Sequence, residues 1–567
     1  MVDNSPASMK KMKERVFKRR ASLKSERDRY ATDWRELSDF VIGARGRFLP
    51  GDGDNGDEAT HRRNERLYNE TPKQAAFTLA SGMMAGITSP ARPWFKLSTH
   101  DPEMEDYEPV RIYLDEVRRI LLTIFARSNF YNAMYNIYLE QGVFGTACMG
   151  IYENYENVIR FEPYTIGSFS LGCDGERNVD TLHREYRTTV GATVKRFGLS
   201  NVSRSVKNMW DNGSYDEKLN IIHAIEPNTD RDYSSPLSTD MAYQSCYYEE
   251  GGDGDKPLLV SGFQELPFVA PRWSVIGEDT YATSYPGIDS LASNKSLQID
   301  ELDSAIAQEK SHNPPLVGDS SLMQSGADLI AGGITYIPNM AQTGKPGLSS
   351  VYDVRFDQAG LNEKIMQKEQ RINRFFYADL FLMLTDIDRR QITATEIAER
   401  KEEKMLMLGP VLDRLNNEAL DPIIDRTFAI AQRAGILPPP PPELEEADLN
   451  IDYISVLAQA QRSISTQATE ATMSFAGSLA DVWPEARHKV DAMQAVADYS
   501  KAKGVSPKMI RSDEEAQEAM AAEQQQAQQQ QMAAMAAQAV DSTKTLSETD
   551  SSNPDSALGG LMDAMTG

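Results

Sequence analysis

RQITATEIAERKEEKMLMLGPVLDRLNNEALDPIIDRTFAIAQRAGILPPPP, residues 390–441, is the stretch of sequence that decides the fold class. Thr393, followed three residues later by Glu396, forms a capping box, which predicts that a helix begins there. After it, apolar residues return at the spacing of one helix face, which predicts a core-facing stripe. The stripe consists of Leu408, Val411, Leu412, Leu415, Leu420, Ile423, Ile424 and Phe428. This stretch therefore predicts long helices packed into a core.

Prolines interrupt this helical region, which extends over residues 361–434. Pro410 and Pro422 have no backbone N–H to donate and are expected to kink the helix. Gly435 is expected to end it, and the prolines that follow predict a stiff, extended linker.

Toward the N-terminus the helical patterns continue. Residues 8–42 predict one long helix with an apolar stripe along it. Thr71 is expected to cap the next helix, with Pro72 in its first position. Amphipathic helices are predicted over 108–127 and 129–141.

The middle of the chain differs, because from Gly142 onward apolar and polar residues alternate between turn signals, which predicts strands. Residues 181–198 are expected to begin as a strand and to become a helix. Residues 218–276 are β-rich again, with the tip of a hairpin at 251–255. The fold class predicted for the whole chain is therefore α+β and mainly helical.

A further helix is predicted over 287–312, followed by a Gly-rich, weakly structured stretch to about residue 350. Its apolar residues Ile288, Leu291, Ile299, Leu302 and Ile306 fall on one side. More helices are predicted over 453–480 and 488–503. The tail from Ser512 is rich in Glu, Gln, Ala and Met, so it could form a helix but has no core of its own, and beyond Asp541 we expect disorder.

The composition is that of an acidic chain: 567 residues carry a net charge of −25, and 40% of them are hydrophobic. Such a chain should repel nucleic acid unless its basic residues are gathered into patches. This argues against a sequence-reading DNA-binding protein, but not against a tube through which DNA slides. One basic stretch near the start is either a solvated helix face or a contact for DNA or an acidic partner. It contains Lys10, Lys11, Lys13, Arg15, Lys18, Arg19 and Arg20.

The three cysteines, Cys148, Cys173 and Cys246, are far apart and odd in number, so a disulfide framework is not expected. No apolar stretch approaches the length of a membrane span, and no contact with a membrane is expected. The first residues lack the apolar core of a signal peptide.

Motifs that carry chemistry are missing from the sequence. The six histidines show no metal-ligand spacing, and His183 and His223 are expected to be hydrogen-bonded structural residues of strands. The pair Gly344–Lys345 is followed by Pro346, which removes the donor that a phosphate-binding loop needs. The loop at 51–59 lacks the ligands of a calcium site. We therefore expect no catalytic residue, no cofactor and no metal, which favours a structural or assembly protein over an enzyme.

Five segments, taken in order, resemble the head-to-tail connecting protein family of short-tailed bacteriophages. They are ERDRYATDWRELSDFVIGARGRF (26–48), NETPKQAAFTLASGMMAGITSPARPWFKL (69–97), PFVAPRWSVIGEDTYATSYPG (267–287), the opening stretch (390–441), and DYISVLAQAQR (452–462) with the later GVSPKMIRSDEEA (504–516). Trp94 matches the aromatic "PW" of the family, and Gly277, Glu278 and Tyr281 fit its Gly-Glu-x-Tyr, with Asp279 and Thr280 both between Glu278 and Tyr281 in this chain. Ala282 stands where the family usually has glycine.

The resemblance implies a portal fold with wing, stem, clip and crown regions, assembled as a ring of about twelve subunits. Carried over to this chain, the regions are the N-terminal part of the wing (1–185), a first stem helix region (186–204), a β-rich clip (205–275), a stem helix (276–315), a tunnel loop (316–348), the C-terminal wing helices (349–440), the crown helices (441–511) and a Gln/Ala-rich, partly disordered tail (512–567).

The resemblance also implies a function: a ring at one capsid vertex through which viral double-stranded DNA is packaged and ejected. The implied partners are further copies of the chain, the terminase large subunit, tail adaptor and nozzle proteins, the major capsid and scaffold proteins, and DNA that passes non-specifically. The chain would be located in the virion, and in the host cytoplasm during assembly. Lys345, in the presumed tunnel loop, is the candidate for touching DNA phosphate, or else an ordinary exposed lysine.

Two alternatives remain at this point. An internal scaffold or ejection-type structural virion protein would also have long helices, but it would lack the β-rich middle and would not close into a ring. An enzyme, for example a nuclease built on scattered carboxylates, would need carboxylates at a defined spacing, and the sequence offers none.

Overall fold

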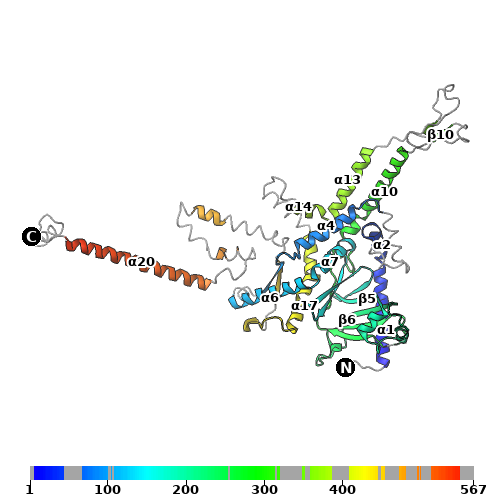
Figure 1. The fold of residues 1–567 in the computed structure, drawn as a ribbon, viewed down its shortest axis with the longest axis horizontal. Coiled ribbons are helices and arrows are strands. Elements are labelled where there is room, and N and C mark those ends of the chain that lie inside the picture. Colours follow the sequence, from blue (N-terminus) through cyan, green and yellow to red (C-terminus); the bar gives the residue numbers. More distant parts are fainter. Residues whose placement is uncertain are drawn as a thin grey trace, which may run out of the picture. The chain divides into compact units, whose positions relative to one another are not determined.

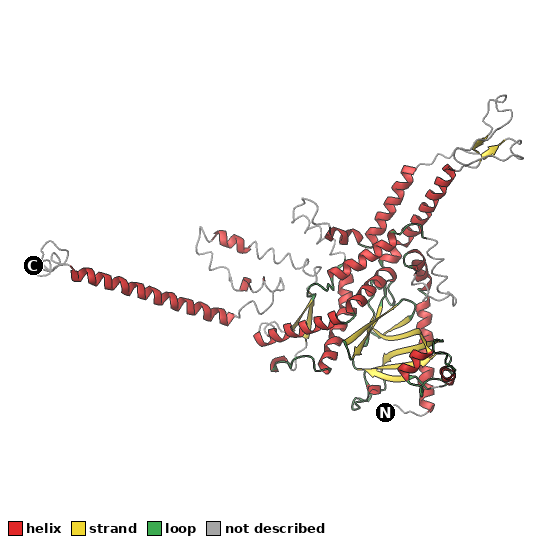
Figure 2. Ribbon diagram, in the orientation of Figure 1, coloured by secondary structure: helices red, strands yellow, loops and turns green. Residues whose placement is uncertain are grey.

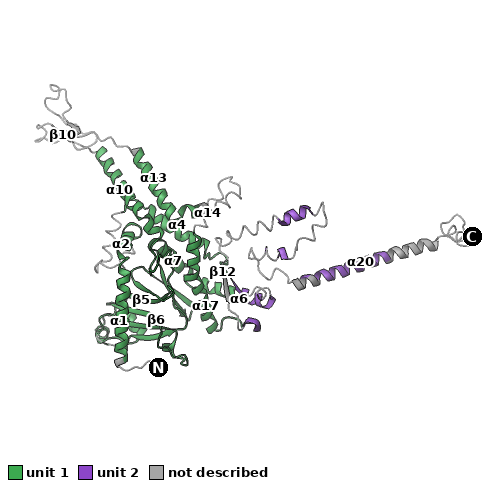
Figure 3. Cartoon of the chain, turned by 180° about the vertical axis from the view of Figure 1, so that it is seen from behind, with its two compact units in different colours: residues 1–96, 117–439, 451–461 green, residues 97–116, 440–450, 462–567 purple. Residues whose placement is uncertain are grey.

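The structure is a computed structural model, and it describes residues 6–43, 67–99, 104, 107–252, 254, 256–312, 316–318, 348–350, 358–385, 408–444, 449–453, 472–479, 494–496, 499 and 513–548. The chain divides into two compact units, coloured separately in Figure 3. Unit 1 comprises Met1–Lys96, Val117–Pro439 and Ile451–Gln461, and unit 2 comprises Leu97–Glu116, Pro440–Asn450 and Arg462–Gly567.

A five-stranded antiparallel sheet is the largest β element of unit 1 (Figure 2). Its strands follow one another in sequence order: β4 (Phe169–Cys173), β5 (Val179–Thr189), β6 (Lys218–Pro227), β7 (Tyr243–Glu249) and β8 (Leu259–Phe263). Ile222 and Tyr248 pack in a cluster with Val16 of α1 (Pro6–Asp28). Ile221 and Tyr247 pack with the helices α8 (Val190–Phe197) and α9 (Arg204–Asp211). Because neighbouring residues of a strand point to opposite faces, α1 covers one face and α8 and α9 cover the other.

A second sheet of unit 1 has the order β3–β2–β9, with β2 (Cys148–Asn154), β3 (Val158–Tyr164) and β9 (Phe268–Val269). Helix α17 (Asp421–Arg433) is bonded to it through the buried Arg426, whose Nε donates to the Ile151 carbonyl at 3.1 Å. Glu265, just before β9, accepts from the same guanidinium at 3.0 Å.

The helices of unit 1 share an aromatic core. Trp94 is stacked on Phe130 with ring centroids 5.7 Å apart, and Phe125 lies 4.5 Å from Phe130. The Ala- and Gly-rich helix α4 (Thr71–Gly86) lies so close to α7 (Phe130–Phe144) that a Cβ added to Gly142 would be 2.5 Å from Leu79. Small residues therefore permit this close helix packing.

Further elements complete the described part of the chain. They are α2 (Ala31–Phe40), β1 (Phe95–Thr99), α6 (Glu108–Arg127), η2 (Ser238–Asp240), α10 (Pro286–His312), β10 (Leu316–Gly318), β11 (Leu348–Ser350), α13 (Gln358–Phe375), α14 (Ala378–Thr385), α16 (Gly409–Leu415), η4 (Asn416–Leu420), η5 (Pro442–Leu444), β12 (Leu449–Tyr453) and α20 (Asp513–Glu548). The mixed, mainly helical fold class is confirmed by this element order.

Two predictions about helix starts are wrong. The single helix expected over 8–42 is interrupted after Asp28, where a turn separates α1 from α2. Thr71 is the first residue of α4 rather than its cap, and its N–H is bound by the Asn69 side chain at 2.8 Å. In both places a local turn redirects the chain, which a helical apolar pattern does not reveal.

Pro422 does not break the helix that contains it. Between α16 and α17 the chain forms a π-helical turn, Asn416–Leu420, and continues as a helix. The wider turn accommodates the proline ring at the start of α17. Gly435 ends α17 with a φ of +66°, as predicted.

The β-rich middle of the chain contains short helices as well as strands. Residues 186–204 supply the end of β5 and the eight-residue α8, which packs on the sheet. Strands β6 to β8 from the segment 205–275 belong to the same sheet as β4 and β5. At the C-terminal end, α20 extends to Glu548, beyond Asp541, where we expected order to end.

Candidate functional site

Two long helices of unit 1, α10 and α13, pack along each other and form what we call the α10–α13 hairpin. In the connection between them β10 and β11 pair antiparallel, with Leu316 opposite Ser350. Figure 1 shows the hairpin extending away from the two sheets, with α2, α4 and α7 near its base. It is the most prominent projection of unit 1 and the candidate site of function.

The segment before α10 fixes the hairpin to the rest of unit 1. Tyr281 is fully buried, its hydroxyl accepts a hydrogen bond from the Leu171 N–H at 2.9 Å, and its ring meets Trp34 edge-on. Gly287 lies so close to α7 that an added Cβ would be 2.0 Å from the Val143 carbonyl oxygen. The segment from Gly277 to Tyr281 therefore has a structural role here: it fixes the start of α10 on the helical core.

The face of α10 that packs on this core carries polar residues beside the buried Leu291 and Leu297. Ser290, Asn294 and Gln298, one turn apart, are 0%, 0% and 3% exposed. In contrast, Ile299 is 57% exposed and Ile306 is 37% exposed. The apolar residues predicted to share one side of this helix are thus divided: Leu291 is buried, whereas Ile299 and Ile306 are exposed.

Asn69, just before α4, links the two helices of the hairpin. Its Nδ2 donates to Glu301 of α10 at 2.8 Å and to Glu369 of α13 at 2.9 Å. The Gln298 side chain bonds both the N–H and the carbonyl of Asn69, each at 2.9 Å. Thr71 adds a hydrogen bond to Glu369 at 3.2 Å. The relative position of α10 and α13 is therefore set by a network of buried and half-buried polar groups.

The two helices carry opposite charge. α10 has five carboxylates, Asp289, Asp300, Glu301, Asp303 and Glu309, and two lysines, Lys295 and Lys310. α13 has four basic residues, Lys364, Lys368, Arg371 and Arg374, and two carboxylates, Glu363 and Glu369. Within the hairpin, Lys368 pairs with Asp300 and donates to Ser296 Oγ at 2.5 Å. Most of the remaining charged groups point outward, so α10 presents an acidic surface and α13 a basic one.

Several residues singled out in the sequence lie outside the described residues. They are Lys345, the capping-box pair Thr393 and Glu396, and the loop at 51–59. Lys345 belongs to the connection between α10 and α13, and its role stays a prediction.

The two strand histidines are structural. The Nε2 of His183 lies 2.7 Å from Glu226, and the His223 ring is stacked on Tyr247 at 3.9 Å with Nε2 2.9 Å from Ser245. Burial, with the nearby Arg184, lowers the pKa of His223 well below its usual value, so the ring is neutral. Across the described ranges, no group of His, Cys, Asp and Glu side chains is arranged to hold a metal ion.

Part of the basic stretch of α1 is used within unit 1. Arg20 bridges Glu185 at 2.8 Å and Glu250 at 2.6 Å, and Arg15 donates to Gln244 at 2.8 Å. The helix is thereby fastened to the sheet that it covers. Lys10, Lys11 and Lys18 remain exposed. The interpretation as a solvated helix face with ion pairs beneath it is the one that these contacts favour.

The three cysteines are free, as expected. Burial raises the pKa of Cys246 to about 12, so its thiol is protonated and unreactive. Among the helices that the structure describes, none combines the length and the apolar character that crossing a bilayer requires.

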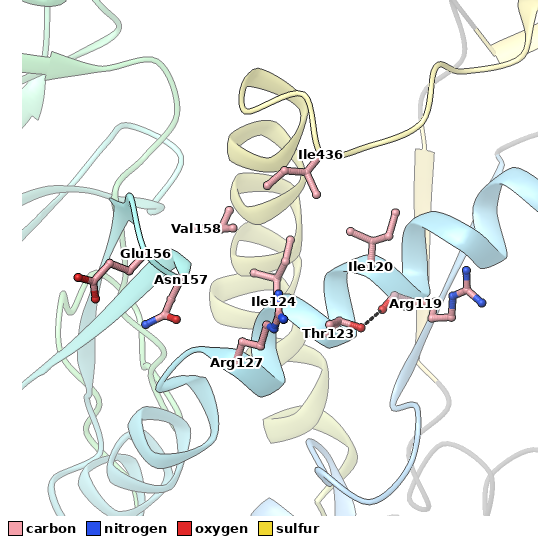
Figure 4. A pocket seen from close by; sticks show the side chains of 9 residues that line it. All are labelled: Arg119, Ile120, Thr123, Ile124, Arg127, Glu156, Asn157, Val158 and Ile436. Carbon is pink, nitrogen blue, oxygen red and sulfur yellow. Dashed lines mark hydrogen bonds between the residues drawn. The ribbon is translucent and has the colours of Figure 1, made fainter.

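A hollow of about 400 Å³ lies between α6 and the turn that joins β2 to β3. Figure 4 shows its lining side chains, with Ile120 and Ile124 on α6, Val158 beside the turn and Ile436 after α17. The charged members are Arg119, Arg127 and Glu156. No nucleophile stands beside a general base among these nine lining residues, so the hollow does not have the composition of an active site.

Comparison with known proteins gives a consistent result. Residues 13–510 match the family model described as "Bacteriophage head to tail connecting protein". The chain is 44% identical over 552 residues to the "Portal protein" of Salmonella phage epsilon15, covering 97% of this chain and 98% of that protein. It is 38% identical over 495 residues to the "Probable portal protein" of Bordetella phage BPP-1, covering 87% and 88%. The chain therefore belongs to the bacteriophage head-to-tail connecting protein family, the portal proteins.

Proposed function

We propose that this portal protein works as a ring of about twelve copies through which double-stranded DNA enters the capsid and later leaves it. Its place at the portal vertex of the virion, and its structural rather than enzymatic nature, follow from the family. The observation that carries the proposal is the 44% identity to a portal protein over nearly the full length of both chains. The same match overturns the internal scaffold or ejection protein and the nuclease as alternatives.

We further propose the order of its partners. The ring first binds the terminase large subunit, which supplies the ATP-driven force, and then exchanges it for tail adaptor and nozzle proteins. Major capsid and scaffold proteins surround it during assembly. The sequence contains no nucleotide-binding loop, so in this proposal the terminase supplies the force and the chain serves as the conduit.

The α10–α13 hairpin is our candidate for the stem of the ring. The resemblance places a clip between two stem helices, but residues 186–204 hold only the short α8, so α10 and α13 are the pair of long helices that meets this description. The connection that contains β10 and β11 is then the clip, which docks the tail. Strands β6 to β8 would belong to the wing, because they continue the sheet of β4 and β5.

Charge supports a channel in which DNA moves freely. Twelve chains of −25 give a ring of about −300, which offers a polyanion no deep electrostatic well. α10 is the more acidic helix of the hairpin, so we assign it to the channel lining. The negative charge along the bore would repel DNA, so contact between the ring and DNA would be weak and non-specific. Isolated lysines would supply the few contacts to phosphate.

Lys345 remains the proposed DNA contact in the connection between the stem helices. Replacing it by alanine should change DNA retention or packaging without changing ring assembly, because one phosphate contact per subunit is lost. The measurement is the amount of nuclease-protected DNA in particles assembled with the variant portal. Lys195→Ala, at an exposed lysine of α8 outside the hairpin, is the matched control. Equal DNA content in wild type and Lys345→Ala would remove Lys345 from the channel.

The proposed function itself is tested by particle assembly with and without the chain. Particles that contain the portal should protect DNA in the presence of terminase and ATP, and particles without it should protect none. Equal protection in both preparations would contradict the proposal.

A further inference from the structure

The α10–α13 hairpin leaves large apolar side chains in contact with solvent. On α10, Ile299 is 57% exposed and Ile306 37% exposed, and on α13, Met366 is 57% exposed. Ile299 and Ile306 are seven residues apart and therefore lie on one face of their helix. A projecting two-helix element has no core of its own in which to bury these groups, so they indicate a contact with another molecule.

The heights of these residues along the hairpin follow from its internal contacts. Asp300 pairs with Lys368, and Asn69 joins Glu301 to Glu369, so residues 300 and 301 are level with residues 368 and 369. Because the helices run antiparallel, Met366 lies at a height between Ile299 and Ile306. The two apolar patches therefore occupy the same level.

The patches lie on different sides of the hairpin. Lys368 faces α10, and Met366 is two positions away, about 200° around the helix, so Met366 faces away from α10. Ile299 lies about 100° from Asp300, which faces α13, and about 100° from Gln298, which is buried in the base. Such a separation suits a head-to-tail contact, in which one side of a copy meets the other side of the next.

We infer that the Ile299–Ile306 face of α10 packs against the Met366 face of α13 from a second copy of the chain, an inference that rests on the proposed ring. In a closed ring, neighbouring copies are related by a rotation about the ring axis with no shift along it. Residues at the same height on neighbouring hairpins therefore meet. Charge supports the pairing, because α10 exposes Asp303 and Glu309 whereas α13 exposes Lys364, Arg371 and Arg374. Opposite charges around an apolar centre are typical of a specific protein interface.

Cysteine cross-linking tests the pairing directly. Ile299→Cys and Met366→Cys are made separately, each purified, and the two are mixed, assembled and oxidised. A disulfide needs Cα atoms within about 7 Å, which only packed faces allow. The mixture should give covalent dimers on a denaturing gel, and each variant alone should give few or none. The double variant Ile299→Cys/Met366→Cys should give a ladder that rises to the full ring.

The controls separate this inference from the proposed function. Ile276→Cys, at a side chain 64% exposed outside the hairpin, should not cross-link with Met366→Cys. Ile299→Asp should reduce the ring fraction at least tenfold while the far-ultraviolet circular dichroism of the protomer stays unchanged. Wild-type rings that form while the mixed cysteines give no dimer, or rings that persist with Ile299→Asp, would overturn the pairing alone. A wild-type chain that forms no ring would overturn the proposed function.

Discussion

Arg426 is a buried charged residue whose loss should be costly to the fold. Its guanidinium is 2% exposed and bonds the Ile151 carbonyl and both the carbonyl and the carboxylate of Glu265. Burial lowers its pKa to about 10, yet it stays charged at neutral pH because Glu265 faces it. Arg426→Met should lower the free energy of unfolding by about 3–5 kcal/mol, since the Ile151 and Glu265 carbonyls lose their buried donor and the Glu265 carboxylate keeps only Arg433. Chemical denaturation of the purified chain measures this.

Arg433 provides the matched control. It pairs with the same Glu265 carboxylate from a side chain that is 44% exposed. Because water screens this pair, Arg433→Met should cost less than about 1 kcal/mol. Equal losses in the two variants would show that burial of Arg426 is not what makes its pairing important.

Asp425 should make stability depend on pH. Asp425 is exposed overall, but partial desolvation by its surroundings, with the nearby Asp421 carboxylate, raises the pKa of its carboxyl to about 6, above the usual value of 3.8. Because folding raises the pKa of this carboxyl, its ionised form destabilises the folded state. This destabilisation is fully present above about pH 6 and absent below the usual pKa of 3.8. Asp425→Asn should therefore raise Tm by about 1 °C at pH 8 and leave it unchanged at pH 3.5. A thermal scan at both pH values checks this, and a gain of the same size at pH 3.5 would exclude the titration as the cause.

At the level of elements, the linkage through Asn69 should determine how firmly α10 is joined to α13. Asn69→Ala removes the donor to both Glu301 and Glu369 and leaves two carboxylates facing each other. We expect amide hydrogen exchange in both helices to become about tenfold faster or more, because each lost bond to a charged group is worth about 1.5–3 kcal/mol. Thr78→Val, which removes a hydroxyl bonded only within α4, should leave the exchange of both helices as it was. Unchanged exchange in Asn69→Ala would contradict the role given to this residue.

Local sequence signals were sufficient to predict structural features that depend only on neighbouring residues. The change from strand to helix after Thr189 and the end of α17 at Gly435 were predicted, since each depends on residues within one turn. The pairing of α10 with α13 was not predicted, because the contacts that create it, such as Lys368 with Asp300, join residues far apart in the sequence. The buried polar residues of α10 were missed for a related reason: Asn294 and Gln298 are buried only because distant backbone groups satisfy them.

The π-helical turn before α17 shows a second kind of limit. Pro422 removes a donor, and the sequence rule therefore predicted a kink, but it did not predict the π-helical turn that precedes the proline. The widened turn Asn416–Leu420 accommodates the proline, and Glu418 within it binds the buried Arg272 at 2.7 Å. Arg272 precedes Glu418 by 146 residues in the sequence, so no local pattern could have predicted this contact.

For the whole molecule, the central claim is that acidic subunits close around an open bore. The net charge of the chain and the charge difference between α10 and α13 act separately: the net negative charge of the whole ring repels DNA, whereas opposite charges meet between copies. Salt should therefore affect both the contacts between copies and the repulsion between the bore and DNA. Raising the ionic strength should weaken contacts between copies, and should screen the repulsion between the bore and DNA.

Electron microscopy of the purified chain tests this claim most directly. Class averages should show rings of about twelve subunits with a central hole wide enough for a DNA duplex, and the hairpin should project along the ring axis. Particles that remain monomeric, or that assemble without a central hole under every condition tried, would contradict the account.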